Sequence, residues 1–367
     1  MKKKICFVGY DNYPVLNPDA GTEYFGGESV QQTLLAKAFH DLGYEVSMIC
    51  GDYGQSDGEV IDGITIYKTY GSSEGLPIVR FIYPRMTSIF AALKRADADI
   101  YYQSCAGMMT GMVAWYCRSN NRKFVFRLAH DSDCIPGQQI IKYWRDRKLY
   151  EYGLKRTDMI AAQGVNQVEL LQKNYQLESI PINMAVEIPK LAQSRRRDID
   201  ILWVNNLRDF KRPELVVDLA KLLPEFNIAM IGGAVPGNDE LYDKVKAEAN
   251  KLDNLSFLGA VSYHEVNNYF LRAKVFVNTS DWEGFPNSFL QAWIRQVPVF
   301  SFFDPDGLIK AKAIGESPEN LDHMADLVRQ YLLSDDKVET VGKRGQEFVL
   351  NNYAPKVIAR RYEKLLA

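Results

Sequence analysis

The chain has 367 residues, enough for two or three domains at roughly 150 residues each. Hydrophobic residues make up 47% and charged residues 25%, an ordinary globular composition that excludes disordered and fibrous architectures. The 44 basic and 46 acidic side chains nearly cancel, so we expect no nucleic acid or other polyanion as a partner.

The cysteines and the N-terminus point to a cytoplasmic protein. The five cysteines are odd in number and lie at least twelve residues apart, which favours reduced thiols over a disulfide framework or a zinc site. The basic start at residues 2–4 leads into an apolar run that ends at Tyr10 without a cleavage site, so no signal peptide is expected. No stretch reaches the roughly 18 apolar residues that a membrane-spanning helix needs.

The first half of the chain alternates apolar strands with amphipathic helices. Short apolar runs closed by glycine, such as residues 5–9, are typical of buried parallel strands. A strand, a helix and a strand within about 45 residues form a βαβ unit. The pattern predicts strands at residues 5–9, 45–50, 100–102, 123–128 and 159–162, and helices at 29–42, 108–117 and 140–152.

The same alternation restarts at residue 199, so the fold class is α/β with two Rossmann-like domains, 1–186 and 199–352. Residues 187–198 contain Pro189 and a run of three arginines, which is typical of a linker. In such folds ligands bind outside the carboxyl ends of the strands, so we expect the site in a cleft between the two halves. The second half predicts strands at 199–204, 227–231, 255–259, 275–278 and 297–303, and helices at 213–223, from about 287, and twice near the C-terminus.

The loop after the first strand lacks the three-glycine fingerprint of nicotinamide-binding folds. It runs from Asp11 to Glu28 and ends in Gly26 and Gly27 just before a helix. Paired glycines let the backbone approach a ligand, and the helix amides can hold an anion. A flexible loop without a ligand is the alternative interpretation.

Residues 278–293 are the most informative stretch. A strand ends in a polar loop containing Glu283 and Gly284, and a helix then begins near Asn287 or Ser288. We expect the amides of Ser288 and Phe289 to suit a diphosphate and Glu283 to suit sugar hydroxyls.

Seven such segments, in the same order, resemble glycosyltransferase family 4, retaining enzymes of the GT-B fold in which two Rossmann-like domains face each other across a cleft. The segments are Gly26-Gly27, residues 46–49, 127–131, 181–183, 203–214, 278–293 and 297–307. The resemblance spans nearly the whole chain. It implies that the last helix, residues 353–367, packs back on the N-terminal domain, which binds the acceptor.

The resemblance implies roles for individual residues, with two departures. Glu283 falls on the acidic residue that contacts the transferred sugar, and Gln291 falls where the family usually has a glutamate on the ribose. Lys211 matches the lysine that neutralises the leaving diphosphate, while the family's arginine position holds Asn206. A neutral Gln291 predicts weaker nucleotide binding, because charge-assisted hydrogen bonds are stronger than neutral ones.

The remaining assignments complete the expected site. His130 follows a strand and falls on the histidine near the donor sugar, and Arg208 could supply the charge that Asn206 lacks. The sequence Asp304-Pro305-Asp306-Gly307 is a turn signal, so no metal or other cofactor is expected. The catalytic set is His130, Lys211 and Glu283, and the donor-binding set is Gly26, Gly27, Arg208, Gly284, Phe285, Asn287, Ser288, Phe289 and Gln291.

The resemblance implies transfer of a sugar, with retention, from a UDP- or GDP-sugar to a glycan or lipid-linked acceptor in polysaccharide or glycoconjugate synthesis. Two alternatives remain open, a nucleotide-sugar epimerase of the same fold and a catalytically idle subunit that scaffolds a partner transferase. Residues 76–95 and 142–156 are basic and amphipathic. They fit peripheral contact with an anionic membrane or, equally, helices with one core face and one solvated basic face.

Overall fold

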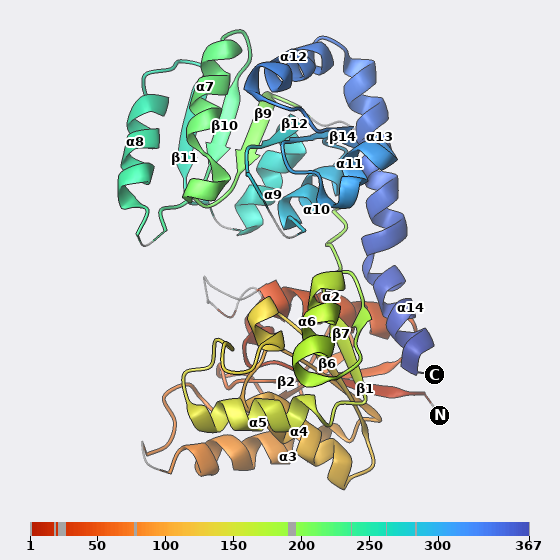
Figure 1. Cartoon of the computed structure of the whole chain (residues 1–367). Coiled ribbons are helices and arrows are strands. Elements are labelled where there is room, and N and C mark those ends of the chain that lie inside the picture. Colours follow the sequence, from red (N-terminus) through yellow and green to blue (C-terminus); the bar gives the residue numbers. More distant parts are fainter. Residues whose placement is uncertain are drawn as a thin grey trace. The chain divides into compact units, whose positions relative to one another are not determined.

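The structure is a computed structural model and describes residues 2–17, 20, 27–76, 79–189, 196–235, 237–261, 263–282 and 285–366. The chain divides into two compact units. One consists of Met1–Glu187 and Tyr353–Ala367, and the other of Ile188–Asn352. Each unit is a sheet of mostly parallel strands covered by helices (Figure 1).

The first unit is built on an eight-stranded sheet in the order β3-β4-β2-β1-β5-β6-β7-β8. All neighbouring strands are parallel except β3, which pairs antiparallel with β4. The chain order runs outward from β1 in both directions, as in doubly wound folds. The strands are β1 (Lys4–Val8), β2 (Glu45–Cys50), β3 (Val60–Ile61), β4 (Ile64–Lys68), β5 (Ile100–Ser104), β6 (Lys123–Arg127), β7 (Met159–Ala162) and β8 (Ile180–Pro181).

Helices cover both faces of this sheet because its strands are apolar on both faces. In β1, Ile5 and Phe7 belong to one core and Cys6 and Val8 to the other, since successive side chains of a strand alternate. The first core is closed by α1 (Tyr13–Leu16), α2 (Gly27–Asp41) and α14 (Pro355–Leu366), and the second by α3 (Thr87–Ala96), α4 (Met108–Ser119), α5 (Trp144–Leu154) and α6 (Val165–Tyr175).

The C-terminal helix α14 packs within the first unit. The ring of Tyr362 lies 5.6 Å from that of Tyr102, and its hydroxyl accepts a hydrogen bond from the buried Arg127 guanidinium at 3.2 Å. Lys123 Nζ donates to the carbonyl of Leu366 at 2.9 Å. These contacts tie the end of the chain to β5 and β6.

The second unit is a six-stranded, all-parallel sheet in the order β11-β10-β9-β12-β13-β14. Counted within the unit, this order is 3-2-1-4-5-6, the order of dinucleotide-binding Rossmann folds. The elements are β9 (Ile199–Val204), α7 (Glu214–Leu222), β10 (Ile228–Ile231), α8 (Asp239–Ala249), β11 (Leu255–Gly259), α9 (Tyr263–Arg272), β12 (Ala273–Asn278), α10 (Asn287–Ile294), β13 (Val299–Ser301), α11 (Leu308–Lys312), β14 (Gly315–Glu316), α12 (Leu321–Leu332) and α13 (Asp335–Tyr353).

The start of α5 and the turn at Asp304 bear on two local predictions from the sequence. The helix predicted from residue 140 begins only at Trp144, because Tyr143 is extended and Ile140 is exposed rather than packed. The turn at Asp304 serves as a helix cap: the Asp304 carboxylate accepts from the amides of Ile309 and Lys310 at 2.7 and 3.2 Å.

No helix in the described part of the chain is long and apolar enough to cross a membrane. All five cysteines are free, and four of them are buried. Burial raises the pKa of the Cys6 thiol to about 12, so this side chain stays a neutral core residue.

Candidate functional site

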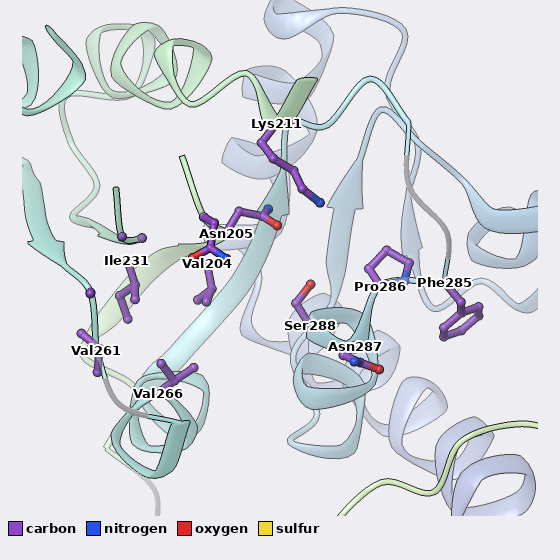
Figure 2. A pocket seen from close by; sticks show the side chains of 14 residues that line it. Val204, Asn205, Lys211, Ile231, Val261, Val266, Phe285, Pro286, Asn287 and Ser288 are labelled. Atoms are coloured by element: carbon purple, nitrogen blue, oxygen red, sulfur yellow. The ribbon is translucent and has the colours of Figure 1, made fainter. Parts of the chain in front are cut away.

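A pocket of about 530 Å³ lies in the second unit, at the carboxyl ends of its central strands (Figure 2). The loops after β9 and β12 border it, and these two strands are the neighbours at which the sheet changes direction. Ligands of doubly wound folds bind at this switch point. The lining consists of Val204–Asn206, Lys211, Ile231–Gly233, Ala260–Val261, Val266 and Phe285–Ser288.

Lys211 gives the pocket its charge. Among the described lining residues it is the only ionisable one, so the site favours an anion. Figure 2 shows its side chain directed from the β9 side toward Ser288 at the start of α10. Its ammonium also lies 5.0 Å from the centroid of the Phe210 ring.

Two buried hydrogen bonds of the Thr279 hydroxyl hold the backbone of Lys211. Thr279 Oγ1 donates to the Lys211 carbonyl oxygen at 2.7 Å and accepts from Trp203 Nε1 at 3.0 Å. Trp203 and Thr279 are both 0% exposed. The position of Lys211 is therefore determined by the core of the second unit as well as by its own loop.

The loop after β12 is also fastened to the loop after β9. The amide of Asp281 donates to the Phe210 carbonyl oxygen at 2.9 Å, and Arg212 Nη1 lies 3.0 Å from Asp281 Oδ1. The Trp282 ring stacks on Phe210 with centroids 4.4 Å apart and an interplanar angle of 16°. The two loops thus form one connected wall beside the pocket.

Asn205 and Gly232 are site residues that sequence reasoning missed. Asn205 Nδ2 is buried and has no hydrogen-bond partner among the described residues, and Asn205 lines the pocket, so this amide can donate to a ligand. A Cβ on Gly232 would overlap the Asn205 carbonyl oxygen, so only glycine fits there. The glycine pair that closes β10 was the available sequence signal.

α10 begins where the sequence predicts, but Asn287 and Ser288 do not serve as its N-cap. Its first residue is Asn287, preceded by the extended Pro286, and no side chain caps it in the described structure. The Phe289 amide donates to the Pro286 carbonyl oxygen at 3.1 Å, and the Phe289 side chain is fully buried against Phe276. The Phe289 amide therefore has an acceptor within the first turn, and its contact with a ligand stays a prediction. Ser288 does line the pocket.

The other predicted catalytic and donor-binding residues, apart from His130, divide into three groups. Lys211, Phe285, Asn287 and Ser288 come together around the pocket. Arg208 is exposed and Gln291 half-buried, and neither is among the residues that line it. Gly26, Glu283 and Gly284 lie outside the described residues, and Gly27 is the first residue of α2 in the first unit.

His130 lies in the first unit, exposed, at the carboxyl end of β6. Its amide and that of Ala129 donate to one carboxylate oxygen of Asp133, at 3.0 and 3.2 Å. Burial raises the pKa of Asp133, and the two amides partly offset that effect. The carboxylate thus fixes the backbone on which the imidazole is mounted.

A second buried carboxyl group lies near this histidine. Burial raises the pKa of Glu28, and the charges of Arg127 and His130 act in the opposite direction. Gln163 Nε2 donates to Glu28 Oε1 at 3.3 Å and also to the carbonyls of Leu128 and Ala129. The N-terminus of α2 and the loop after β6 therefore share one polar network.

A comparison with protein families matches the unit that holds the pocket. Residues 187–348 match the family model described as "Glycosyl transferases group 1". A curated relative, the O-antigen biosynthesis glycosyltransferase WbnH of Escherichia coli, is 25% identical over 187 residues, which are 47% of this chain and 50% of the relative. The chain therefore spans about half the length of the curated relatives it matches.

Solved structures cover the chain completely or nearly so. Sucrose-phosphate synthase from Thermosynechococcus elongatus has a TM-score of 0.69 at 16% identity, and the match covers 100% of this chain and 98% of the synthase chain. The Anabaena protein HepE, in complex with UDP and glucose, has a TM-score of 0.67 at 13% identity, with 99% of both chains covered. At these identities the likeness shows the fold, so the prediction of an α/β protein with two Rossmann-like domains of the GT-B type is confirmed.

Proposed function

We propose that the protein is a retaining glycosyltransferase of family 4 that transfers a sugar from a UDP- or GDP-sugar to an acceptor hydroxyl. The observation that carries the proposal is the pocket at the switch point of the second unit, where Lys211 and the first turn of α10 lie together. The match of residues 187–348 to a glycosyltransferase family model supports it independently.

The pocket suits the diphosphate of a nucleotide-sugar. A lysine ammonium and the amino-terminal end of a helix both stabilise negative charge, and Asn205 adds an unpaired amide donor. Gly232 and Gly233 let a ligand approach the backbone at the end of β10. The apolar lining residues Val261 and Val266 are suited to the face of a base.

Catalysis rests on stabilising charge where it develops. As the bond from the anomeric carbon to the diphosphate breaks, negative charge grows on the phosphate oxygens, and Lys211 is placed to neutralise it. The acceptor proton goes to a phosphate oxygen of the donor, so the reaction needs no protein base. We expect no metal or other cofactor, as the resemblance to GT-B enzymes implies. We assign the sugar hydroxyls to Glu283 and the neighbourhood of the reacting carbon to His130.

The acceptor is a glycan or a lipid-linked glycan in polysaccharide synthesis. The name of the Escherichia coli relative WbnH, an O-antigen biosynthesis glycosyltransferase, supports this class of acceptor. The five free cysteines fit a reducing, cytoplasmic setting, in which nucleotide-sugars are made.

One observation favours a second candidate, an idle subunit that scaffolds a partner transferase. Asn206 lines the pocket at the position where the resemblance implies an arginine, and Gln291 brings no charge. Such a subunit would bind nucleotides weakly or not at all.

Calorimetric titration of the full chain with UDP, GDP and ADP separates the candidates. We expect binding of UDP or GDP, and Lys211→Ala should lower turnover of the matching nucleotide-sugar about 100-fold or more, with Lys211→Arg as the charge-retaining control. Gln291→Glu should tighten binding if this side chain meets the ribose. No heat with any nucleotide would favour the idle subunit, and near-normal turnover of Lys211→Ala would remove the assignment of Lys211.

A further inference from the structure

One face of the first unit carries exposed apolar side chains set among basic ones. The exposed fractions of six side chains lie between 50% and 78%. Apolar patches of this kind are uncommon on proteins that act without a surface partner. We call this region the basic-aromatic face and define it by Ile82, Tyr83, Trp115, Ile140, Tyr143 and Trp144.

The tertiary structure brings this face together from segments far apart in the chain. The Arg145 guanidinium at the start of α5 lies 3.5 Å from the centroid of the Phe81 ring, just before α3. Trp115 on α4 packs edge-to-face on Phe90 of α3, with ring centroids 5.1 Å apart. Figure 1 shows α3, α4 and α5 side by side in the first unit, and their mutual contacts agree.

Two of the helices in this region, α4 and α5, are packed closely against each other. A Cβ on Gly111 of α4 would overlap the Leu149 carbonyl of α5, and a Cβ on Gly153 of α5 would overlap the Thr110 carbonyl of α4. The two helices therefore touch backbone to backbone, and the side chains on their outer surface cannot withdraw between them.

The two segments that contribute to this face are strongly basic, and of their basic residues Arg95 is paired outside them, with Asp57 at 3.1 Å. Residues 80–95 contain four basic and no acidic residues, and residues 142–156 contain six basic and two acidic ones. Both acidic residues are paired locally, Asp146 with Arg145 at 2.8 Å and Glu151 with Lys148 at 3.1 Å. The two segments thus carry a net charge of +8 in a chain whose net charge is −2.

We propose that the basic-aromatic face docks on a bilayer that contains anionic lipids. Indole and phenol rings favour the headgroup layer, and lysine and arginine are attracted to anionic headgroups. An acidic protein could pair with the basic side chains, but it would also need a complementary pocket for each exposed ring. The headgroup layer of a bilayer accommodates such rings without a pocket. The inference builds on the proposed function, because docking would hold the enzyme where a lipid-linked acceptor is found.

Vesicle co-sedimentation of the full chain tests the proposal. We expect binding to vesicles of equal parts phosphatidylcholine and phosphatidylglycerol, little binding to phosphatidylcholine alone, and loss of binding as salt is raised. The double variant Lys94→Gln/Lys142→Gln should bind about 30-fold more weakly, since each basic residue contributes about fivefold. Tyr143→Ala/Trp144→Ala should also weaken binding, because it removes two exposed rings.

Matched variants on the second unit serve as controls. Lys244→Gln/Lys246→Gln removes two exposed lysines of α8, and Leu333→Ala removes a side chain that is 75% exposed. These controls should bind vesicles like the unchanged chain. The calorimetric affinity for UDP or GDP should be the same in every variant, which also checks that each one folds.

The outcomes are distinguishable. Equal binding to the two kinds of vesicle, or equal loss in the controls and the face variants, would overturn the proposal. Unchanged vesicle binding together with altered self-association in the ultracentrifuge would assign the face to a second copy of the chain instead. Vesicle binding without nucleotide binding would leave the membrane proposal standing and count against the transferase.

Discussion

Thr279→Val tests whether the two hydrogen bonds of the buried Thr279 hydroxyl hold Lys211 in place at the pocket. The Thr279 hydroxyl bonds to the Lys211 carbonyl oxygen at 2.7 Å and to the Trp203 indole nitrogen at 3.0 Å. Valine has nearly the same shape but neither donates nor accepts, so the substitution deletes both bonds without opening a cavity. Serine keeps the hydroxyl and loses only a methyl group, which makes Thr279→Ser the matched control.

The cost follows from the groups left unpaired. The indole of Trp203 is 0% exposed, so its N–H loses its only acceptor in the described structure, at roughly 1–3 kcal/mol. The Lys211 carbonyl belongs to a half-buried residue, and water can partly replace its donor, so about 1 kcal/mol is expected there. The sum for valine is about 2–4 kcal/mol, against about 1 kcal/mol for serine.

Urea unfolding gives the readout. With an m-value of about 2 kcal/mol/M, the midpoint of the second unit should fall by about 1–2 M for valine and about 0.5 M for serine. Hydrogen exchange of residues 199–213 at each urea concentration reports this unit separately, because a chain with two units can unfold in two steps. Calorimetry should show that valine weakens UDP or GDP binding more than serine does, since Lys211 loses its anchor.

Equal midpoints and equal nucleotide affinities for the two variants would refute the reasoning. They would mean that local loop contacts, and not the hydroxyl of Thr279, hold Lys211 in place.

Three further predictions concern other parts of the structure. Gly232→Ala should destabilise the second unit by about 2 kcal/mol or more, because the new Cβ would overlap the Asn205 carbonyl. Gly233→Ala should have a smaller effect, because the nearest atom to its Cβ is 3.3 Å away. Equal melting temperatures of the two variants in a thermal-shift assay would contradict this prediction. Glu28→Gln should stabilise the first unit near neutral pH. Burial raises the pKa of the Glu28 carboxyl, so its ionised form destabilises the folded unit above that pKa, and this cost disappears as the pH falls toward the ordinary value of 4.5. A stability gain that does not shrink as the pH falls would argue against this explanation. Trp282→Ala should cost about 1 kcal/mol by removing the stacked ring, with Trp282→Phe retaining most of it, and an unchanged urea midpoint for the alanine variant would show that the stack does not stabilise the loop.

Much of the fold could be read from local patterns. Apolar runs such as residues 199–204 and the helical periodicity of residues 29–42 depend only on near neighbours, because strands and helices repeat every two and 3.6 residues. The same holds for the loop that carries Lys211, whose place after a strand and before a helix follows from the order of elements. Periodicity does not say which apolar side chains are buried, so it misplaced one boundary: the helix expected from residue 140 starts at Trp144.

Contacts between distant residues were decided only by the tertiary structure. Nothing near Thr279 in the sequence indicates that it bonds to residues 76 and 68 positions earlier, Trp203 and Lys211. The burial of Phe289 depends on the rotational phase of α10, which its neighbours in the core determine. Residues 80–95 and 142–156 each read as an ordinary basic helix, and the packing of α3, α4 and α5 makes them one face. The alternation of strands and helices is a local property of the sequence, whereas a site is a set of side chains that meet, and packing of the whole chain selects which ones do.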